Sequence, residues 1–181
     1  MLEITIPKTE YFKSDTQEFG YYDAQTLKFE HSLISISKWE SKWTKPFLTD
    51  KQKTQEEISS YIQCMCITPV SDKSVFNRLT PTNQQELTDY IAAPMTATWI
   101  TDKRPNTSKR VITSEVIYAQ MIGLGIPVEF EKWHINRLLT LIKVCDIMFN
   151  DDPKNKMSKK EIYQSNRELN EKRRKELNTT G

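Results

Sequence analysis

The sequence is poor in glycine, histidine and cysteine, and these shortages exclude several classes of site. Its 181 residues include four glycines, two histidines and three cysteines. Four dispersed glycines leave no Gly-rich phosphate-binding loop. The sequence also lacks G-x-S-x-G, H-E-x-x-H and paired C-x-x-C motifs. It therefore predicts a protein that is not an enzyme, with no catalytic or cofactor-binding residues.

No apolar run in the chain approaches the length of a transmembrane helix, which is roughly 18 residues. The N-terminus also lacks a signal-peptide pattern. A hydrophobic content of 37% is low and predicts a modest core with polar extensions. Cys64, Cys66 and Cys145 lie in apolar segments, which predicts buried thiols in a reducing cytoplasm. Cys64 and Cys66 offer two ligands where a structural zinc site needs four, so no metal site is expected.

Two short segments near the N-terminus alternate apolar and polar residues. Residues 2–6 and 27–31 are predicted to form an N-terminal β-hairpin, with residues 8–25 as a long connection. His31 lies on the apolar side of the second strand and is expected to be a hydrogen-bonded packing residue. Residues 95–99 also alternate, which predicts a strand, with Val111 and Ile112 as its partner.

Helices are predicted from apolar periodicity and from capping residues. The first covers residues 33–47, with Ser32 as its N-cap and Pro46 at its end. Thr54 and Glu57 form a capping box before a stripe of four residues, Ile58, Tyr61, Ile62 and Met65. A single short turn is expected at residues 75–79. A second capping box at Thr82 and Gln85 precedes the stripe Leu87, Tyr90 and Ile91, and Pro94 ends that helix.

The densest apolar pattern spans residues 115–149 and is interrupted at Gly123, Gly125 and Pro127. Helical spacing continues from Ile135 to Phe149, so two helices joined by a short turn form a predicted αα-hairpin. Glu129 and Glu131 share a predicted turn with His134, an arrangement typical of a surface pair. The predicted fold is α+β and mostly helical, with an N-terminal β-hairpin, a central helical bundle and an extended C-terminal helix.

Charge is distributed unevenly along the chain. Residues 153–181 carry nine basic and four acidic side chains, whereas the whole chain has a net charge of +2. We therefore predict a globular domain at 1–152 and a basic, partly disordered helical arm at 153–181. Ser158 and Glu161 form a capping box at the start of the arm's helix. The basic loop at 101–110 is interpreted as solvated, with phosphate contact as the alternative.

Four segments carry a resemblance to a known family: LKFEHSLISISKWESKWTKPFL (27–48), IAAPMTATW (91–99), SEVIYAQMIGLGIPVEFEKWHINRLLTLIKVC (114–145) and KMSKKEIYQSNRELNEKRRKEL (156–177). In this order they resemble the tail assembly chaperones of long-tailed, siphovirus-type bacteriophages. The resemblance covers most of the chain.

The resemblance implies a late phage protein that binds and solubilises the tape-measure protein during tail morphogenesis. Such a protein acts in the host bacterial cytoplasm and is absent from the mature virion. The tail-tube protein and self-association are further partners that the resemblance allows, and many relatives have a longer form made by ribosomal frameshifting. The predicted partner-binding residues are two tryptophans and one face of the arm: Trp39, Trp43, Arg167, Leu169, Asn170, Arg173, Arg174 and Leu177.

Alternatives remain open from the sequence. Trp39 and Trp43 fit a core role equally well. A structural virion component, such as a head–tail connector or a tail-terminator-like ring protein, is the alternative function. Nucleic-acid binding by the arm is disfavoured because Tyr163 is its only aromatic residue, which provides no stacking platform.

Overall fold

A computed structural model describes residues 1–49, 52–100, 111–149, 167 and 171. The fold is α+β, roughly half helical, with two small antiparallel sheets. Residues 1–143 and 144–181 form two compact units, and the division falls within the last described helix. The predicted boundary at 152/153 lies outside the described residues and stays a prediction.

The first sheet pairs β1 (Leu2–Ile6) with β4 (Gln25–Phe29) in antiparallel register, with Ile4 opposite Leu27. One face is buried and holds Ile4, Ile6, Leu27 and Phe29. The other face carries a Glu3–Lys28 ion pair at 3.0 Å and a hydrogen bond between the Thr5 and Thr26 hydroxyls. Both predicted strands are therefore confirmed, although β4 ends at Phe29, before His31.

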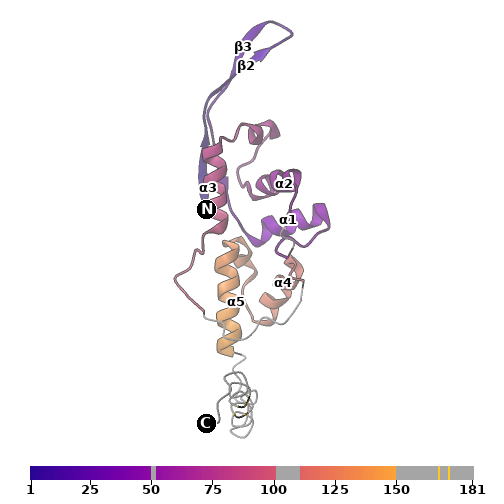
Figure 1. The fold of residues 1–181 in the computed structure, drawn as a ribbon, viewed down its shortest axis with the longest axis vertical. Helices are drawn as coiled ribbons and strands as arrows, with labels where there is room; N and C mark the ends of the chain where they lie inside the picture. The colour runs from indigo at the N-terminus through magenta and orange to yellow at the C-terminus, as the bar shows by residue number, and fades with distance from the viewer. Residues whose placement is uncertain (50–51, 101–110, 150–166, 168–170, 172–181) are drawn as a thin grey trace. The chain divides into compact units, whose positions relative to one another are not determined.

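The segment between these strands is a second hairpin, so the prediction of a plain connection over residues 8–25 is wrong. β2 (Thr9–Lys13) pairs with β3 (Glu18–Tyr22), and Gln17 in the turn has a positive φ of 56°. Figure 1 shows this hairpin continuing from the β1–β4 pair. The sequence shows no apolar–polar alternation here because exposed aromatics lie on one face of β2–β3, while the other face is only half-buried.

Two capped helices follow, and both caps were predicted. In α1 (Leu33–Trp43) the Ser32 hydroxyl accepts from the Ser35 amide, and the helix ends at left-handed Thr44 rather than at Pro46. α2 (Gln55–Met65) starts with the predicted box of Thr54 and Glu57 and packs against α1. Ile58 was predicted on the buried stripe but is 42% exposed.

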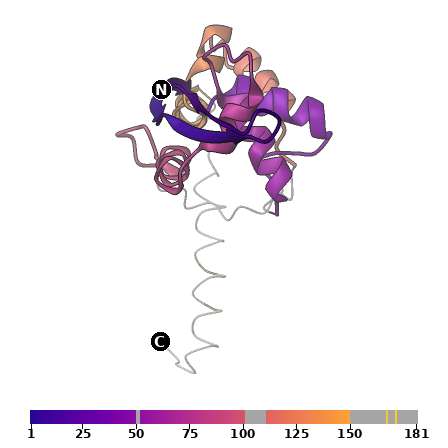
Figure 2. The same cartoon turned by 90° about the horizontal axis from the view of Figure 1, so that it is seen from above.

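The third helix starts two residues earlier than its predicted box implied. After a 3-10 helix, η1 (Lys73–Arg78), α3 (Pro81–Ala92) is capped by Thr80, whose hydroxyl accepts from the Asn83 amide. Pro81 is tolerated at the first helical position because its missing N–H has no helical partner there. Seen from above, the N-terminal strands run between α3 on one side and α1 and α2 on the other (Figure 2).

The predicted strand at 95–99 is absent, as is its partner at Val111 and Ile112. Met95 has a φ of 52°, which breaks an extended run, and Trp99 is 86% exposed. Val111 and Ile112 are exposed as well. The basic loop at 101–110 lies outside the described residues.

The remaining elements are α4 (Ser114–Gly123), the 3-10 helix η2 (Val128–Lys132) and α5 (Ile135–Phe149). Both long helices were predicted, but the αα-hairpin is wrong because α4 packs mainly against α1 and η2. The connection also contains Gly125 with a φ of 66°, a conformation that glycine adopts readily. In α5 the buried residues are Ile135, Leu138 and Ile142, and Phe149 is exposed, contrary to the predicted stripe.

Candidate protein-binding site

The two tryptophans proposed for partner contact differ in exposure. Trp39 is fully buried, and its indole N–H donates to the Glu57 carbonyl at 2.9 Å. Trp43 is half-buried, stacks on Trp39 with ring centroids 6.2 Å apart, and donates to the Ser60 hydroxyl at 3.1 Å. Trp39 therefore has the core role that the sequence left open, whereas Trp43 retains exposed surface beside α2.

The contact between α1 and α2 is reinforced by a buried carboxylate. Glu57 accepts from the Lys45 ammonium at 2.5 Å and from the Thr54 amide at 2.7 Å. These hydrogen bonds, that from Lys45 foremost, lower the pKa of Glu57. Buried hydrogen bonds hold α1 against α2. The outward-facing side chains of this helix pair therefore project from a well-supported backbone.

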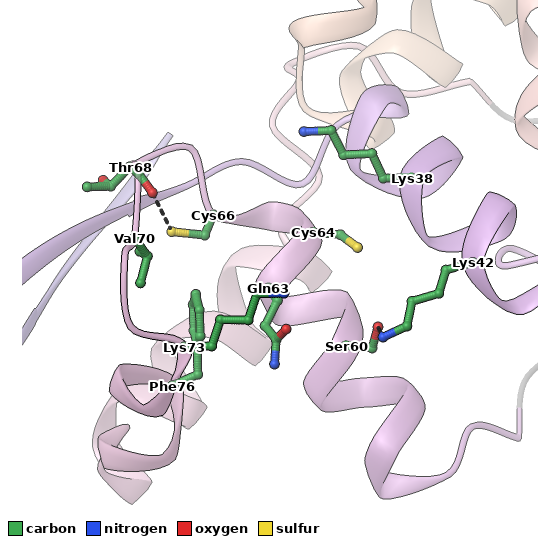
Figure 3. A pocket seen from close by; sticks show the side chains of 10 residues that line it. All are labelled: Lys38, Lys42, Ser60, Gln63, Cys64, Cys66, Thr68, Val70, Lys73 and Phe76. Carbon is green, nitrogen blue, oxygen red and sulfur yellow. Dashed lines mark hydrogen bonds between the residues drawn. The ribbon is translucent and has the colours of Figure 1, made fainter.

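A pocket of about 340 Å³ lies between α1, α2 and η1 (Figure 3). Lys38 and Lys42 extend into it from α1 and Lys73 from η1. The Lys42 ammonium donates to the Ser60 hydroxyl at 3.0 Å. The other lining residues are neutral: Ser60, Gln63, Cys64, Cys66, Thr68, Val70 and Phe76. Three ammonium groups without a lining carboxylate make this pocket attractive to anions.

The pocket also contains two of the cysteines. Burial raises the pKa of the Cys64 thiol, while Lys42, Lys38 and Lys73 oppose that rise. Burial also raises the pKa of Cys66, whose thiol donates to the Thr68 carbonyl at 3.4 Å. All three cysteines are free and half-buried, so the prediction of buried thiols holds only in part. A raised pKa keeps Cys64 and Cys66 protonated at neutral pH and disfavours a nucleophilic role.

On the other side of α2, a groove of about 260 Å³ with a mixed apolar and uncharged polar lining separates α2 from η1 and α3. Its aliphatic and aromatic lining residues are Ile58, Tyr61, Ile62, Phe76, Leu79, Leu87 and Ile91. Its other lining residues are polar and uncharged: Gln55, Ser59, Gln63, Asn77, Gln84 and Thr88. Gln63 and Phe76 line both the groove and the lysine-lined pocket, so the two hollows adjoin.

The two histidines meet in a buried cluster. His31 shares a hydrogen bond with the Tyr61 hydroxyl, which confirms its predicted packing role. Burial is the main cause that lowers the pKa of His31 to about 3, and the neighbouring His134 is the second cause. Because the Asn136 amide donates to His134 Nδ1, the other ring nitrogen is the donor to the Tyr90 carbonyl at 3.0 Å. Both imidazoles are neutral and their hydrogen bonds join the β4–α1, α2, α3 and α5 segments.

The predicted surface arrangement of His134 with two glutamates is therefore wrong. His134 is buried and faces Tyr90, and Glu131 instead accepts from the Tyr118 hydroxyl at 2.7 Å. Within the described ranges there is no group of three or more His, Cys, Asp or Glu side chains placed to hold a metal ion. In the same part of the chain, no helix is both long enough and apolar enough to cross a membrane.

The arm residues proposed for partner contact lie almost entirely outside the described residues. Arg167 is helical and exposed, and its guanidinium lies 3.4 Å from the Glu171 carboxylate one turn later. Five predicted contacts cannot be placed: Leu169, Asn170, Arg173, Arg174 and Leu177. Conversely, sequence reasoning missed the lysine-lined pocket. Its only local signal was the i, i+4 spacing of Lys38 and Lys42.

No family model, curated protein or solved structure matches this chain.

Proposed function

We propose that this chain is a phage tail assembly chaperone that binds and solubilises the tape-measure protein during tail morphogenesis. The observation that carries the proposal is the junction of two hollows along α2, where Gln63 and Phe76 line both an uncharged groove with apolar and polar residues and a lysine-lined pocket. The resemblance of the four segments names the partner. The groove and pocket supply the chemistry that such a partner needs.

A groove of this kind suits an amphipathic helix. Helix-in-groove recognition places apolar side chains at i, i+3, i+4 and i+7 against an apolar floor. Ile58, Phe76 and Leu87 line the groove and offer such contacts, and its uncharged polar residues would accept or donate hydrogen bonds without requiring a particular charge on the helix. Acidic side chains beside the helix's apolar face would reach Lys38, Lys42 and Lys73 in the adjoining pocket. A helper that covers such helices hides apolar surface that otherwise aggregates.

The proposed role is not enzymatic and is exercised in the host bacterial cytoplasm, with the protein absent from the mature virion. In this proposal the basic arm at 153–181 adds a second contact, through Arg167, Leu169, Asn170, Arg173, Arg174 and Leu177. Trp43 borders the lysine-lined pocket through its hydrogen bond to Ser60, whereas Trp39 supports the site from the core.

The test is co-expression of the full chain with the tape-measure protein of the same genome. We expect the tape measure to become soluble and to co-purify. Ile58→Glu, at the groove, should abolish co-purification, while Ile122→Glu, at a 73% exposed position of α4, should not. A chain ending at Asp152 measures the separate contribution of the arm.

The pocket is tested with a charge reversal. Lys38→Glu with Lys73→Glu should weaken co-purification, and Lys143→Glu, an exposed position outside the pocket, is the matched control. The complex should also resist added salt better than a phosphate-bound complex, whose affinity falls steeply with ionic strength. A full chain that leaves the tape measure insoluble and appears as a ring in purified particles would instead establish a structural virion component.

A further inference from the structure

The β2–β3 hairpin carries an exposed aromatic face. Phe12, Phe19 and Tyr21 lie on one face and are 54%, 65% and 57% exposed, and the two phenylalanine centroids are 5.2 Å apart. On the other face, the ring of Tyr11 lies over Gly20 and stacks against Tyr22 with centroids 4.4 Å apart. A cluster of three large exposed aromatics on one small sheet indicates an interaction surface.

The hairpin is also incomplete as a sheet. It has two strands, and in the described part of the chain no third strand pairs with either edge. An isolated two-stranded hairpin is marginally stable in water, and additional strands or a covered face are needed for a stable sheet. Open edges and an uncovered aromatic face together favour recognition by strand addition.

We propose that the hairpin of a second copy of this chain pairs with β3, antiparallel and about a two-fold axis at Gly20. Such pairing places Phe19 of one copy opposite Tyr21 of the other, twice, and all four rings lie on the exposed face. The two hairpins then form one four-stranded sheet in which each cross-strand row holds three aromatic rings, Phe12 and Phe19 of one copy and Tyr21 of the other, and ends at Glu10 of the second copy. Aromatic cross-strand pairs of this kind stabilise sheets.

The choice of a second copy rests on the symmetry of the β3 sequence. Phe19 and Tyr21 flank Gly20, so a two-fold axis there brings aromatic rings together and no like charges. The same operation on β2, centred on Tyr11, would pair only Tyr11 with its counterpart and would place the Glu10 carboxylate opposite Phe12, twice. β3 gives two Phe–Tyr pairs and is therefore the more self-complementary edge of the hairpin.

A second observation comes from Arg78 of η1, which lies over the Tyr22 ring at 4.4 Å. Its Nε and Nη1 atoms are buried and have no hydrogen-bond partner in the described chain. Asp72, the carboxylate whose pKa Arg78 helps to lower, is itself hydrogen-bonded to Ser74. Pairing about Gly20 places Glu18 of the second copy opposite Tyr22, so a carboxylate lies near the positive charge of Arg78 over that ring.

The pairing is expected to be weak and reversible. Two edges of five residues each bury less surface than the roughly 1,200–2,000 Å² of a stable interface, so the dimer should depend on protein concentration. This inference does not rest on the proposed chaperone function, because it uses only the geometry of the hairpin.

The experiment is sedimentation velocity of the full chain over a hundredfold range of concentration. We expect a monomer–dimer equilibrium. Phe19→Lys should weaken the dimer at least tenfold, while Trp99→Lys, which removes a more exposed aromatic elsewhere, should leave it unchanged. A wild-type chain that stays monomeric throughout, or equal dimerisation of both variants, would overturn the proposal.

A second measurement tests the register. Phe19→Cys protein mixed with Tyr21→Cys protein should form an intermolecular disulfide, because these positions face each other in the proposed pairing. Each variant alone should crosslink much less, since its cysteines would lie on opposite sides of the axis. Equal crosslinking in all three samples would contradict the axis at Gly20, as would exclusive binding of the hairpin to a different protein.

Discussion

The imidazole rings of His31 and His134 meet edge to face, with centroids 5.0 Å apart, in the buried interior of the first compact unit. His31 comes from the β4–α1 junction and His134 from the start of α5. Their backbones are joined as well, because the Ile135 amide donates to the His31 carbonyl at 2.7 Å. The cluster therefore connects segments about one hundred residues apart. Its effect on the free energy of unfolding at acidic pH can be predicted.

The free energy of unfolding should decrease as the pH falls below the ordinary pKa of histidine, about 6.5. The pKa of His31 is lowered to about 3 in the folded chain, so below pH 6.5 the unfolded chain takes up a proton that the folded chain does not. Stability is thus complete above pH 6.5 and is lost progressively toward pH 3. For His31 alone the loss at pH 5 is about 2 kcal/mol.

Urea denaturation at pH 7.5 and pH 5 measures this loss. His31→Phe, which cannot be protonated, should show a smaller decrease in the free energy of unfolding between the two pH values. Burial also lowers the pKa of His134, so some acid sensitivity should remain in that variant. An equal decrease in both proteins would show that His31 is not held neutral by its surroundings.

The exposures of Trp39 and Trp43 predict different effects of the same substitution. Trp39→Phe removes a donor to the Glu57 carbonyl and leaves a void in the core, so it should cost about 1–3 kcal/mol. Trp43→Phe loses one hydrogen bond from a half-buried position and should cost less than about 1 kcal/mol. Urea denaturation of the two variants at pH 7.5 provides the comparison. Equal costs would contradict the assignment of Trp39 to the core.

Where local chemistry determined the structure, the sequence predicted it well. Ser32 and Thr54 supply side-chain acceptors at helix starts, and both caps form as expected. Residues 95–99 show the opposite case. Their alternation fits a strand, but a strand needs a partner, and with Met95 in a left-handed conformation the chain leaves the extended region. Periodicity alone carries no information on pairing.

The candidate site was harder to predict because its residues come together only by tertiary packing. Lys73 lies in a 3-10 helix far along the chain from Lys38, and only the packing of α1, α2 and η1 brings both into one pocket. The hairpin was missed for a related reason. Aromatic residues lie on both the half-buried and the exposed face of this strand pair, so the sequence shows no apolar–polar alternation, and Phe12 and Phe19 were interpreted as aromatics of a loop.

The start of α3 gives a sharp test of its cap. The Thr80 hydroxyl accepts from the Asn83 amide, and the Asn83 side chain accepts from the Thr80 amide. Thr80→Ala should therefore cost about 1 kcal/mol, whereas Thr82→Ala, at an exposed position inside the helix, should stay within about 0.5 kcal/mol. The midpoint of thermal unfolding, followed by circular dichroism, distinguishes them. A larger effect of the Thr82 substitution would instead favour Thr82 as the N-cap, as the sequence predicted.

Glu40 joins α1 to two distant amides and should be sensitive to loss of its charge. Its carboxylate is buried and accepts from the Phe47 amide at 2.8 Å and from the Ser114 amide at 2.7 Å, at the start of α4. Glu40→Gln keeps one acceptor oxygen but turns an NH₂ group toward an N–H donor. Hydrogen bonds to a charged acceptor contribute about 1.5–3 kcal/mol, so the variant should lose about 2 kcal/mol.

Two measurements locate that loss. Urea denaturation gives its size, with Glu86→Gln on the exposed side of α3 as the control. Amide hydrogen exchange should show faster exchange at Ser114 and Phe47, because these amides lose their acceptor, while the Trp39 indole N–H keeps its bond to the Glu57 carbonyl. Since α4 packs mainly against α1 and η2, loss of the Glu40–Ser114 contact should loosen α4 before the α1–α2 pair. Uniform loss of protection across both helices would mean that Glu40 stabilises the whole fold and does not act locally at α4.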